Sequence, residues 1–150
     1  MVLVAINMGR AKLADRLRAA NVAFHNGARV GIDAIKVQPA FIRDPPGELA
    51  EALRAWLKTG TRKGRWVFFA RASVDDIDRS LEASPYIEAV NVLHENRVLV
   101  SVSDAADNLD LELTREEWER LRPELESILG QPLDYDIEEL TREEGNKDAP

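Results

Sequence analysis

The sequence predicts a single α+β domain, built from a mostly antiparallel sheet with helices on one face. Three observations support this class. Helix-like and strand-like segments alternate along 150 residues, two pairs of strand segments are joined by turn-like sequences, and 45% of the residues are hydrophobic. A chain of this length buries roughly 70% of its unfolded surface, so it needs no disulfide or metal to fold. We expect the domain to span residues 1–137, followed by an acidic, flexible tail at 138–150.

Helices are predicted where apolar residues recur at spacings of three and four. Ser73, with acidic residues after it, resembles a helix cap, and Thr114 to Glu117 matches the capping box. Pro123 should kink or split the last helix, because proline lacks the amide hydrogen that a helix interior uses. The predicted helices cover 10–21, a segment between Asp44 and Lys58, 73–84 and 114–129.

Strands are predicted from short apolar or alternating runs, at 2–6, 22–24, 29–37, 66–71, 86–93, 97–103 and 133–137. Asn26-Gly27 is typical of a hairpin turn, because both residues accept positive φ. The resulting β-α-β-β-α order is ferredoxin-like and can be read twice, in halves 1–60 and 61–137. If the hairpin at 86–103 forms a sheet edge, it could pair with the same hairpin of another chain, which predicts a homodimer.

The net charge of −7 conceals a strong segregation along the chain. Residues 1–72 hold 13 Lys and Arg against 5 Asp and Glu (+8), whereas 73–150 hold 7 against 22 (−15). Such asymmetry is typical of a protein with a charged partner, although the two halves could also neutralise each other within the fold.

Several kinds of chemistry lack support in the sequence. The absence of cysteine excludes disulfides, thiolate nucleophiles and cysteine-based metal sites. His25 and His94 fall in predicted turns, and no glycine-rich nucleotide fingerprint is present. The acidic groups form no calcium loop, and Asp104, Asp107 and Asp110 fit a polar loop. We therefore expect no cofactor, no metal and no catalysis, with a small-ligand sensor or an enzyme as the weaker alternative.

No apolar run is long enough for a signal peptide or a membrane span, so we expect a cytoplasmic protein that does not bind membranes. The leading hypothesis is a non-catalytic protein–protein adaptor or chaperone-like module. It would steer a basic partner by charge through the acidic second half. The residues expected to do so are Glu116, Glu117, Glu119, Glu124 and Glu126.

The alternative hypothesis is nucleic-acid binding by the basic and aromatic stretch 54–71. Basic side chains neutralise phosphates, and exposed aromatic rings stack on bases. The run from Lys63 to Phe69 departs from the strand motif of RNA-recognition domains, which has an aromatic residue at the position of Arg65 and a small one at that of Trp66. The expected phosphate-binding residues are Arg54, Lys58, Arg62, Lys63, Arg65 and Arg71.

Overall fold

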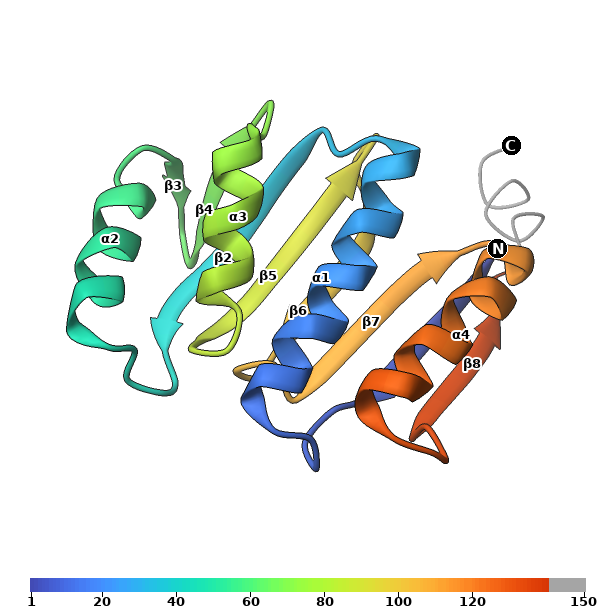
Figure 1. Ribbon diagram of the computed structural model, residues 1–150. Coiled ribbons are helices and arrows are strands. Elements are labelled where there is room, and N and C mark those ends of the chain that lie inside the picture. Colours follow the sequence, from blue (N-terminus) through green and yellow to red (C-terminus); the bar gives the residue numbers. More distant parts are fainter. Residues whose placement is uncertain (141–150) are drawn as a thin grey trace.

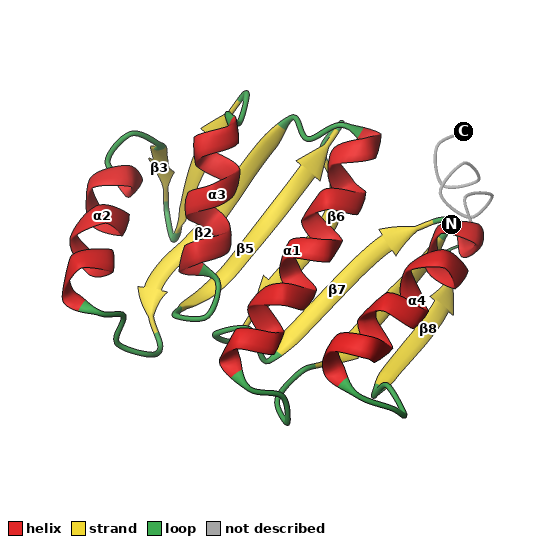
Figure 2. Cartoon of the chain, viewed as in Figure 1, coloured by secondary structure: helices red, strands yellow, loops and turns green. Residues whose placement is uncertain are grey.

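Eight strands of the computed structural model form one continuous sheet, and the structure describes residues 1–140 of the chain. The strand order is β3-β4-β2-β5-β6-β7-β1-β8, and every neighbouring pair is antiparallel. The four helices all lie on one face of this sheet (Figures 1 and 2). The predicted α+β class is confirmed. The strands are β1 (Val2–Asn7), β2 (Ala34–Phe41), β3 (Thr61–Lys63), β4 (Trp66–Ala70), β5 (Ile87–His94), β6 (Arg97–Ser103), β7 (Asn108–Leu113) and β8 (Tyr135–Glu139), and the helices are α1 (Leu13–Val30), α2 (Gly47–Leu57), α3 (Val74–Ala83) and α4 (Arg115–Leu129).

The ferredoxin-like order occurs twice, with one unit inserted into the other. The inserted unit is β2-α2-β3-β4-α3-β5, residues 34–94, and its strands lie in the order β3-β4-β2-β5. The outer unit consists of β1, α1, β6, β7, α4 and β8, in the strand order β6-β7-β1-β8. In both, the first strand lies between the third and the fourth. These units differ from the consecutive halves 1–60 and 61–137, because a boundary after residue 60 would separate β4 from its partner β2.

The core lies between the sheet and the helices, and β1 shows how the sequence produces it. Val2, Val4 and Ile6 face the helices and are at most 1% exposed, whereas Leu3 and Ala5 face the opposite side. Burying an aliphatic side chain of this kind contributes roughly 1.5–3 kcal/mol. The alternation therefore fixes which face of the sheet the helices cover.

Helix α1 is longer than predicted and continues through the strand expected at 22–24 and the turn expected at Asn26-Gly27. Gly27 is buried where α1 crosses the sheet, and a Cβ there would lie 3.6 Å from Cγ2 of Val100 on β6. Asn26 donates a hydrogen bond to Glu117 on α4 at 3.4 Å. These two residues serve helix packing instead of a turn, so the strand expected at 29–37 begins later, at Ala34.

Two further expectations about strands are wrong. The segment containing Asp110 is not a loop, because Asn108–Leu113 forms β7 and pairs with both β1 and β6. The hairpin at 86–103 is not an edge, because β5 pairs with β2 and β6 pairs with β7. An edge-paired homodimer through this hairpin is therefore ruled out, since both of its strands already have neighbours.

The C-terminal part of the described chain also departs from expectation. Helix α4 runs through Pro123 as one helix from Arg115 to Leu129, so Pro123 does not split it in two. The predicted tail begins inside β8, because Glu138 and Glu139 pair with β1 as part of that strand. The remainder of the predicted tail, from residue 141 onward, lies outside the described residues.

One ion pair, between buried Arg16 and half-exposed Asp107, anchors the loops at the N-terminal end of α1. Arg16 is 8% exposed, and its guanidinium donates to the carbonyls of Ala11 at 2.9 Å and Gly9 at 2.8 Å. The same group lies 2.5 Å from a carboxylate oxygen of Asp107. Arg16 thereby connects the loop after β1 to the loop before β7, and each of the three nitrogens of its guanidinium group has a hydrogen-bond partner.

Candidate functional site

The helices leave one face of the sheet uncovered by any other element within residues 1–140 (Figure 1). We call this the open sheet face. Residues that pair directly across antiparallel strands share a face. One row of such pairs crosses all eight strands. From β3 to β8 it consists of Thr61, Phe68, Lys36, Asn91, Ser101, Asp110, Ala5 and Asp136.

The β7-β1-β8 side of the open sheet face is acidic. Asp110 and Glu112 alternate with buried leucines on β7, and the register places Asp136 and Glu138 of β8 beside Ala5 and Leu3 of β1. Partial burial raises the pKa of Asp110 above its ordinary value, because desolvation disfavours the carboxylate. Glu112 accepts a hydrogen bond from Arg97 at 3.0 Å. Three of these four carboxylates therefore have no ion-pair partner among residues 1–140.

The β3-β4-β2 side carries lysines over half-buried aromatic rings. Nζ of Lys36 lies 4.6 Å from the ring centroid of Trp66, and Nζ of Lys63 lies 5.7 Å from that of Phe68. Both distances are within the range of cation–π attraction. Trp66 and Phe68 alternate on β4 with Val67 and Phe69, which are buried under the helices. The open sheet face is thus polarised, with carboxylates at one end and lysines over aromatic rings at the other.

At the centre of this face, the row that crosses all eight strands is polar and uncharged, whereas Leu93, the next residue of β5 on this face, is apolar and 9% exposed. The hydroxyl of Ser101 on β6 donates to the side-chain carbonyl of Asn91 on β5 at 2.7 Å. These two strands join the inserted unit to the outer unit. The charge polarity therefore follows the two units: the lysines belong to the inserted unit and the carboxylates to the outer unit.

The structure separates the six basic residues that the sequence singled out. Arg54 and Lys58 belong to the helix layer, where the Arg54 guanidinium lies 5.7 Å from the ring of Phe41. Arg62 and Arg65 line a shallow cavity of about 420 Å³ beside Gln38, Pro39, Ala40 and Glu88. Arg71 follows the far end of β4, about 17 Å from the β3–β4 turn at the rise of an extended strand.

Only Lys63 of the six thus lies beside an aromatic ring of the open sheet face, and Lys36 was missed. A signal for Lys36 was present in the sequence: a lone lysine between Ile35 and Val37, both of which are fully buried, must point to the opposite face.

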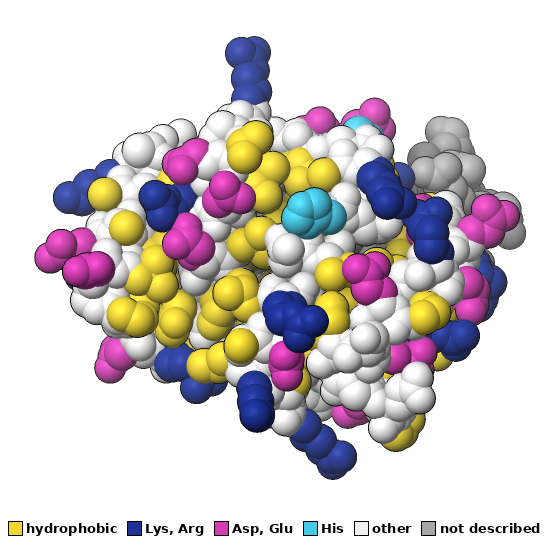
Figure 3. Space-filling model, viewed as in Figure 1, with side chains coloured by type: hydrophobic (Ala, Val, Ile, Leu, Met, Phe, Trp, Pro, Cys, Tyr) yellow, Lys and Arg dark blue, Asp and Glu magenta, His cyan; other side chains and the backbone are white. Residues whose placement is uncertain are grey.

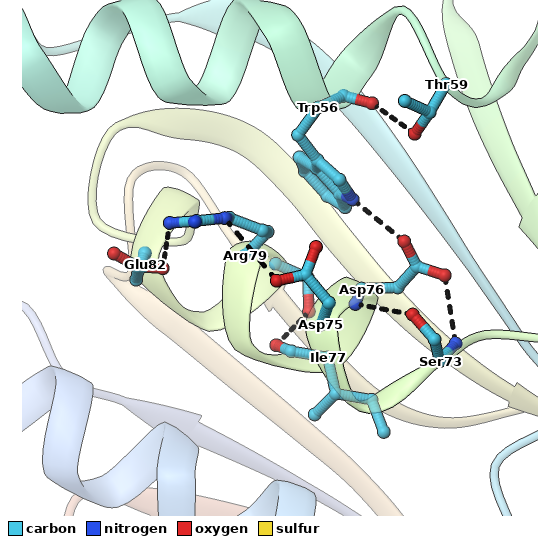
Figure 4. Close-up of polar contacts among 9 residues, drawn as sticks. Trp56, Thr59, Ser73, Asp75, Asp76, Ile77, Arg79 and Glu82 are labelled. Carbon is cyan, nitrogen blue, oxygen red and sulfur yellow. Dashed lines mark hydrogen bonds and ion pairs between the residues drawn. The ribbon is translucent and has the colours of Figure 1, made fainter.

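The aromatic side chains of the stretch 54–71 divide between the two faces. Trp56 is 5% exposed, and its ring stacks on Phe69 with centroids 4.3 Å apart. Its indole nitrogen donates to Asp76 on α3 at 3.0 Å, and Asp76 also accepts from the backbone of Ser73 at 2.9 Å (Figure 4). Burial tends to raise the pKa of Asp76, but hydrogen bonds from Ser73 and Trp56 outweigh it and lower the pKa. Trp56 therefore has a structural role, joining α2 to β4 and α3.

The helix-covered face is not polarised in this way. Acidic and basic side chains are interspersed over it, with apolar side chains between the helices (Figure 3). The acidic helix α4 is partly compensated, because Glu119 pairs with Arg122 at 3.0 Å and Arg115 pairs with Glu139. Glu117 caps the helix through Thr114, so its carboxylate is already engaged.

A polar groove of about 340 Å³ lies between α1 and α4, lined in part by Asn21, His25, Arg29, Arg120 and Glu124. Nδ1 of His25 lies 2.8 Å from the backbone carbonyl of Asn21, one turn earlier in the same helix. His25 is therefore a helical residue bonded to its own helix and not a turn residue. The groove contains no hydrogen-bonded nucleophile–base pair among the described side chains.

Comparison with protein-family models, curated proteins and solved structures gives no match for this chain. Within residues 1–140, no three His, Cys, Asp or Glu side chains are placed to hold a metal ion. None of the described helices is both long and apolar enough to cross a membrane.

Proposed function

We propose that this protein is a non-catalytic protein-binding module, and that the open sheet face is its binding surface. One observation carries this proposal: a face of eight strands is left uncovered within residues 1–140 and combines aromatic rings with segregated charges. Aromatic side chains are enriched in protein interfaces, and complementary charges orient partners and accelerate association. This surface replaces α4 as the site proposed for adaptor function, because two of the five α4 carboxylates, Glu117 and Glu119, already have partners and α4, within residues 115–129, lacks exposed aromatic rings beside its charges.

Site-specific photo-crosslinking tests the proposal. A photoreactive phenylalanine analogue at Phe68 should yield covalent protein adducts, and Lys36→Glu should reduce their yield. Val74 is the control position, because it is 75% exposed but lies on α3 in the helix layer. Equal adduct yields from the two positions, or none from Phe68, would refute the open sheet face as the binding surface.

A second candidate function is binding of single-stranded nucleic acid by the β3-β4-β2 side. The specific observation is that Trp66 and Phe68 share a face with Lys36 and Lys63, an arrangement on which bases could stack while the lysines contact phosphates. The carboxylates of β7 and β8 would repel a strand that continued across the sheet. Any bound strand should therefore be short and restricted to the inserted unit.

Fluorescence anisotropy with labelled single-stranded and duplex oligonucleotides, at low and physiological salt, tests this second candidate. Binding should fall steeply with salt and disappear in the variants Lys63→Glu and Phe68→Ala. Lys58→Glu is the matched control, because Lys58 caps the C-terminus of α2 in the helix layer. No binding at low salt would eliminate the candidate.

A further inference from the structure

We infer that the open sheet face binds a second copy of this chain, related by a two-fold axis that runs parallel to the strands between β5 and β6. This inference rests on the proposed function and names the partner of the same surface. It differs from the hairpin-edge dimer excluded above, because here the two sheets stack face to face. Two antiparallel sheets stacked in this way pack with their strands about 30° apart and their backbones about 10 Å apart.

The charge polarity selects this axis. Two-fold symmetry can stack identical sheets about an axis parallel or perpendicular to the strands. A perpendicular axis places each strand over its own counterpart, so carboxylates face carboxylates and lysines face lysines. A parallel axis reverses the strand order, so β3 faces β8, β4 faces β1, β2 faces β7 and β5 faces β6. Only the parallel axis brings the lysine side of one copy over the carboxylate side of the other.

The residues that face each other across this axis are complementary in charge and in hydrophobicity. A two-fold rotation involves no translation along its axis, so the row that crosses all eight strands faces the same row of the other copy. Lys36 then opposes Asp110, and Phe68 opposes Ala5. Leu3, which is 37% exposed and lies on β1, faces the Ala70 end of β4, and Trp66 faces the Asn7 end of β1. Charge thus meets opposite charge, and apolar strand meets apolar strand.

The centre of the interface is compatible with the same axis. Asn91 and Ser101 lie on either side of the axis, and each faces the other residue type on the second copy. An amide and a hydroxyl supply both donors and acceptors, so this pair can bond across the interface without an unpaired charge.

The area of the face is sufficient for a stable dimer. Eight strands spaced about 4.8 Å apart and averaging about 20 Å in length give roughly 750 Å² for each copy. A stable interface buries roughly 800 Å² on each partner. The uncharged centre and the aromatic strand supply the desolvated part, while the charges at either end fix the orientation.

Analytical ultracentrifugation over a wide range of concentrations tests the inference. The wild type should dimerise, and either Lys36→Glu or Asp110→Lys should raise the dissociation constant about tenfold or more, by opposing like charges twice in each dimer. The double variant should recover dimerisation. An equimolar mixture of the two single variants should form heterodimers, because Glu at 36 then opposes Lys at 110 and the native Lys36 opposes the native Asp110.

The matched controls are Lys12→Glu and Asp44→Lys, which make the same charge changes at exposed positions outside the sheet. They should leave the dissociation constant unchanged. Circular dichroism of each variant separates a loss of dimerisation from a loss of folding.

Cross-linking reports the geometry independently of charge. Because the chain has no cysteine, Ser101→Cys introduces a single thiol beside the axis. A short bis-maleimide should join two such chains covalently, whereas a thiol at Asp15 on α1 should not react in this way. Dimers that form but respond to none of these substitutions would overturn the proposed arrangement.

A monomeric wild type at every concentration would overturn the second copy as the partner. The wider proposal would still stand if photo-crosslinking at Phe68 captured a different protein, and it would fail as well if Phe68 yielded no adducts or no more than Val74. Oligonucleotide binding at the same surface by a monomeric wild type would instead favour the nucleic-acid candidate.

Discussion

Trp56 joins three elements through one side chain, which makes it the most informative single residue for stability. Trp56→Phe keeps an aromatic ring against Phe69 but removes the hydrogen bond to Asp76. We expect this variant to lose about 1.5–3 kcal/mol of unfolding free energy at neutral pH, the range for hydrogen bonds to charged groups. Urea denaturation followed by circular dichroism measures the change.

The hydrogen bond between Trp56 and Asp76 also predicts that its contribution to the unfolding free energy depends on pH. The pKa of Asp76 is lowered by its hydrogen bonds in the folded state, so its stabilising contribution is complete above the ordinary carboxyl pKa, near 4. The contribution is lost as the pH falls through the lowered pKa. The difference in unfolding free energy between the wild type and Trp56→Phe should therefore shrink below pH 4. A difference that is constant with pH would show that the charge of Asp76 does not contribute.

For single residues, the sequence predicts the contacts that form between residues close together in the chain. The capping box from Thr114 to Glu117 forms as predicted, and Ser73 caps α3. Both depend on residues three positions apart. The role of Lys36 depends instead on Trp66, thirty residues later, and no local pattern contains that pairing. The six basic residues were grouped by their proximity in sequence, which a helix, a turn and a strand then distribute over different parts of the fold.

The turn between α2 and β3 provides a prediction about the packing of elements. A Cβ at Gly60 would lie 2.5 Å from Cγ1 of Val67 and 2.9 Å from the carbonyl oxygen of Phe68, so the turn must approach β4 closely. Gly60→Ala should therefore destabilise the protein by about 1–3 kcal/mol. Gly47→Ala is the control, because a Cβ there meets nothing within 4 Å and alanine favours the helix. Equal thermal midpoints for the two variants would contradict the close approach.

Helices and strands were predictable where buried apolar residues set a clear periodic or continuous pattern in the sequence. Strand β4 and the pair β5–β6 were found because their apolar residues are continuous or alternate. Strand β7 was missed because Asn108, Asp110 and Glu112 resemble a loop, although Leu109, Leu111 and Leu113 alternate with them. Those polar residues belong to the open sheet face. The same side chains therefore obscured the strand pattern in the sequence and give the surface its negative charge.

The nested arrangement of the whole molecule could not be predicted from the order of elements that the sequence pattern indicates. Strand β1 pairs with β7 and β8, more than 100 residues later, whereas β2 pairs with strands of its own unit. Nested units and consecutive halves differ in their element order, but the sequence pattern places a strand at 22–24, which is helical, and none at β3 or β7, so the predicted order fits consecutive halves. Long-range strand pairing, which no local pattern encodes, decides between them.

Nesting predicts that the two units unfold together. Helix α1 contacts β5 and α3 of the inserted unit as well as β6 and α4 of the outer unit, and the sheet is continuous across β5 and β6. The tryptophans report each unit separately, because Trp56 and Trp66 lie in the inserted unit and Trp118 in the outer unit. Fluorescence of Trp118→Phe and of the double variant Trp56→Phe/Trp66→Phe should each follow the same denaturant midpoint as that variant's own circular dichroism. Within either variant, a fluorescence midpoint that differs from the circular dichroism midpoint would mean that the inserted unit is an independent domain. Coincident midpoints would mean that the open sheet face exists only when both units are folded, since its lysines belong to one unit and its carboxylates to the other.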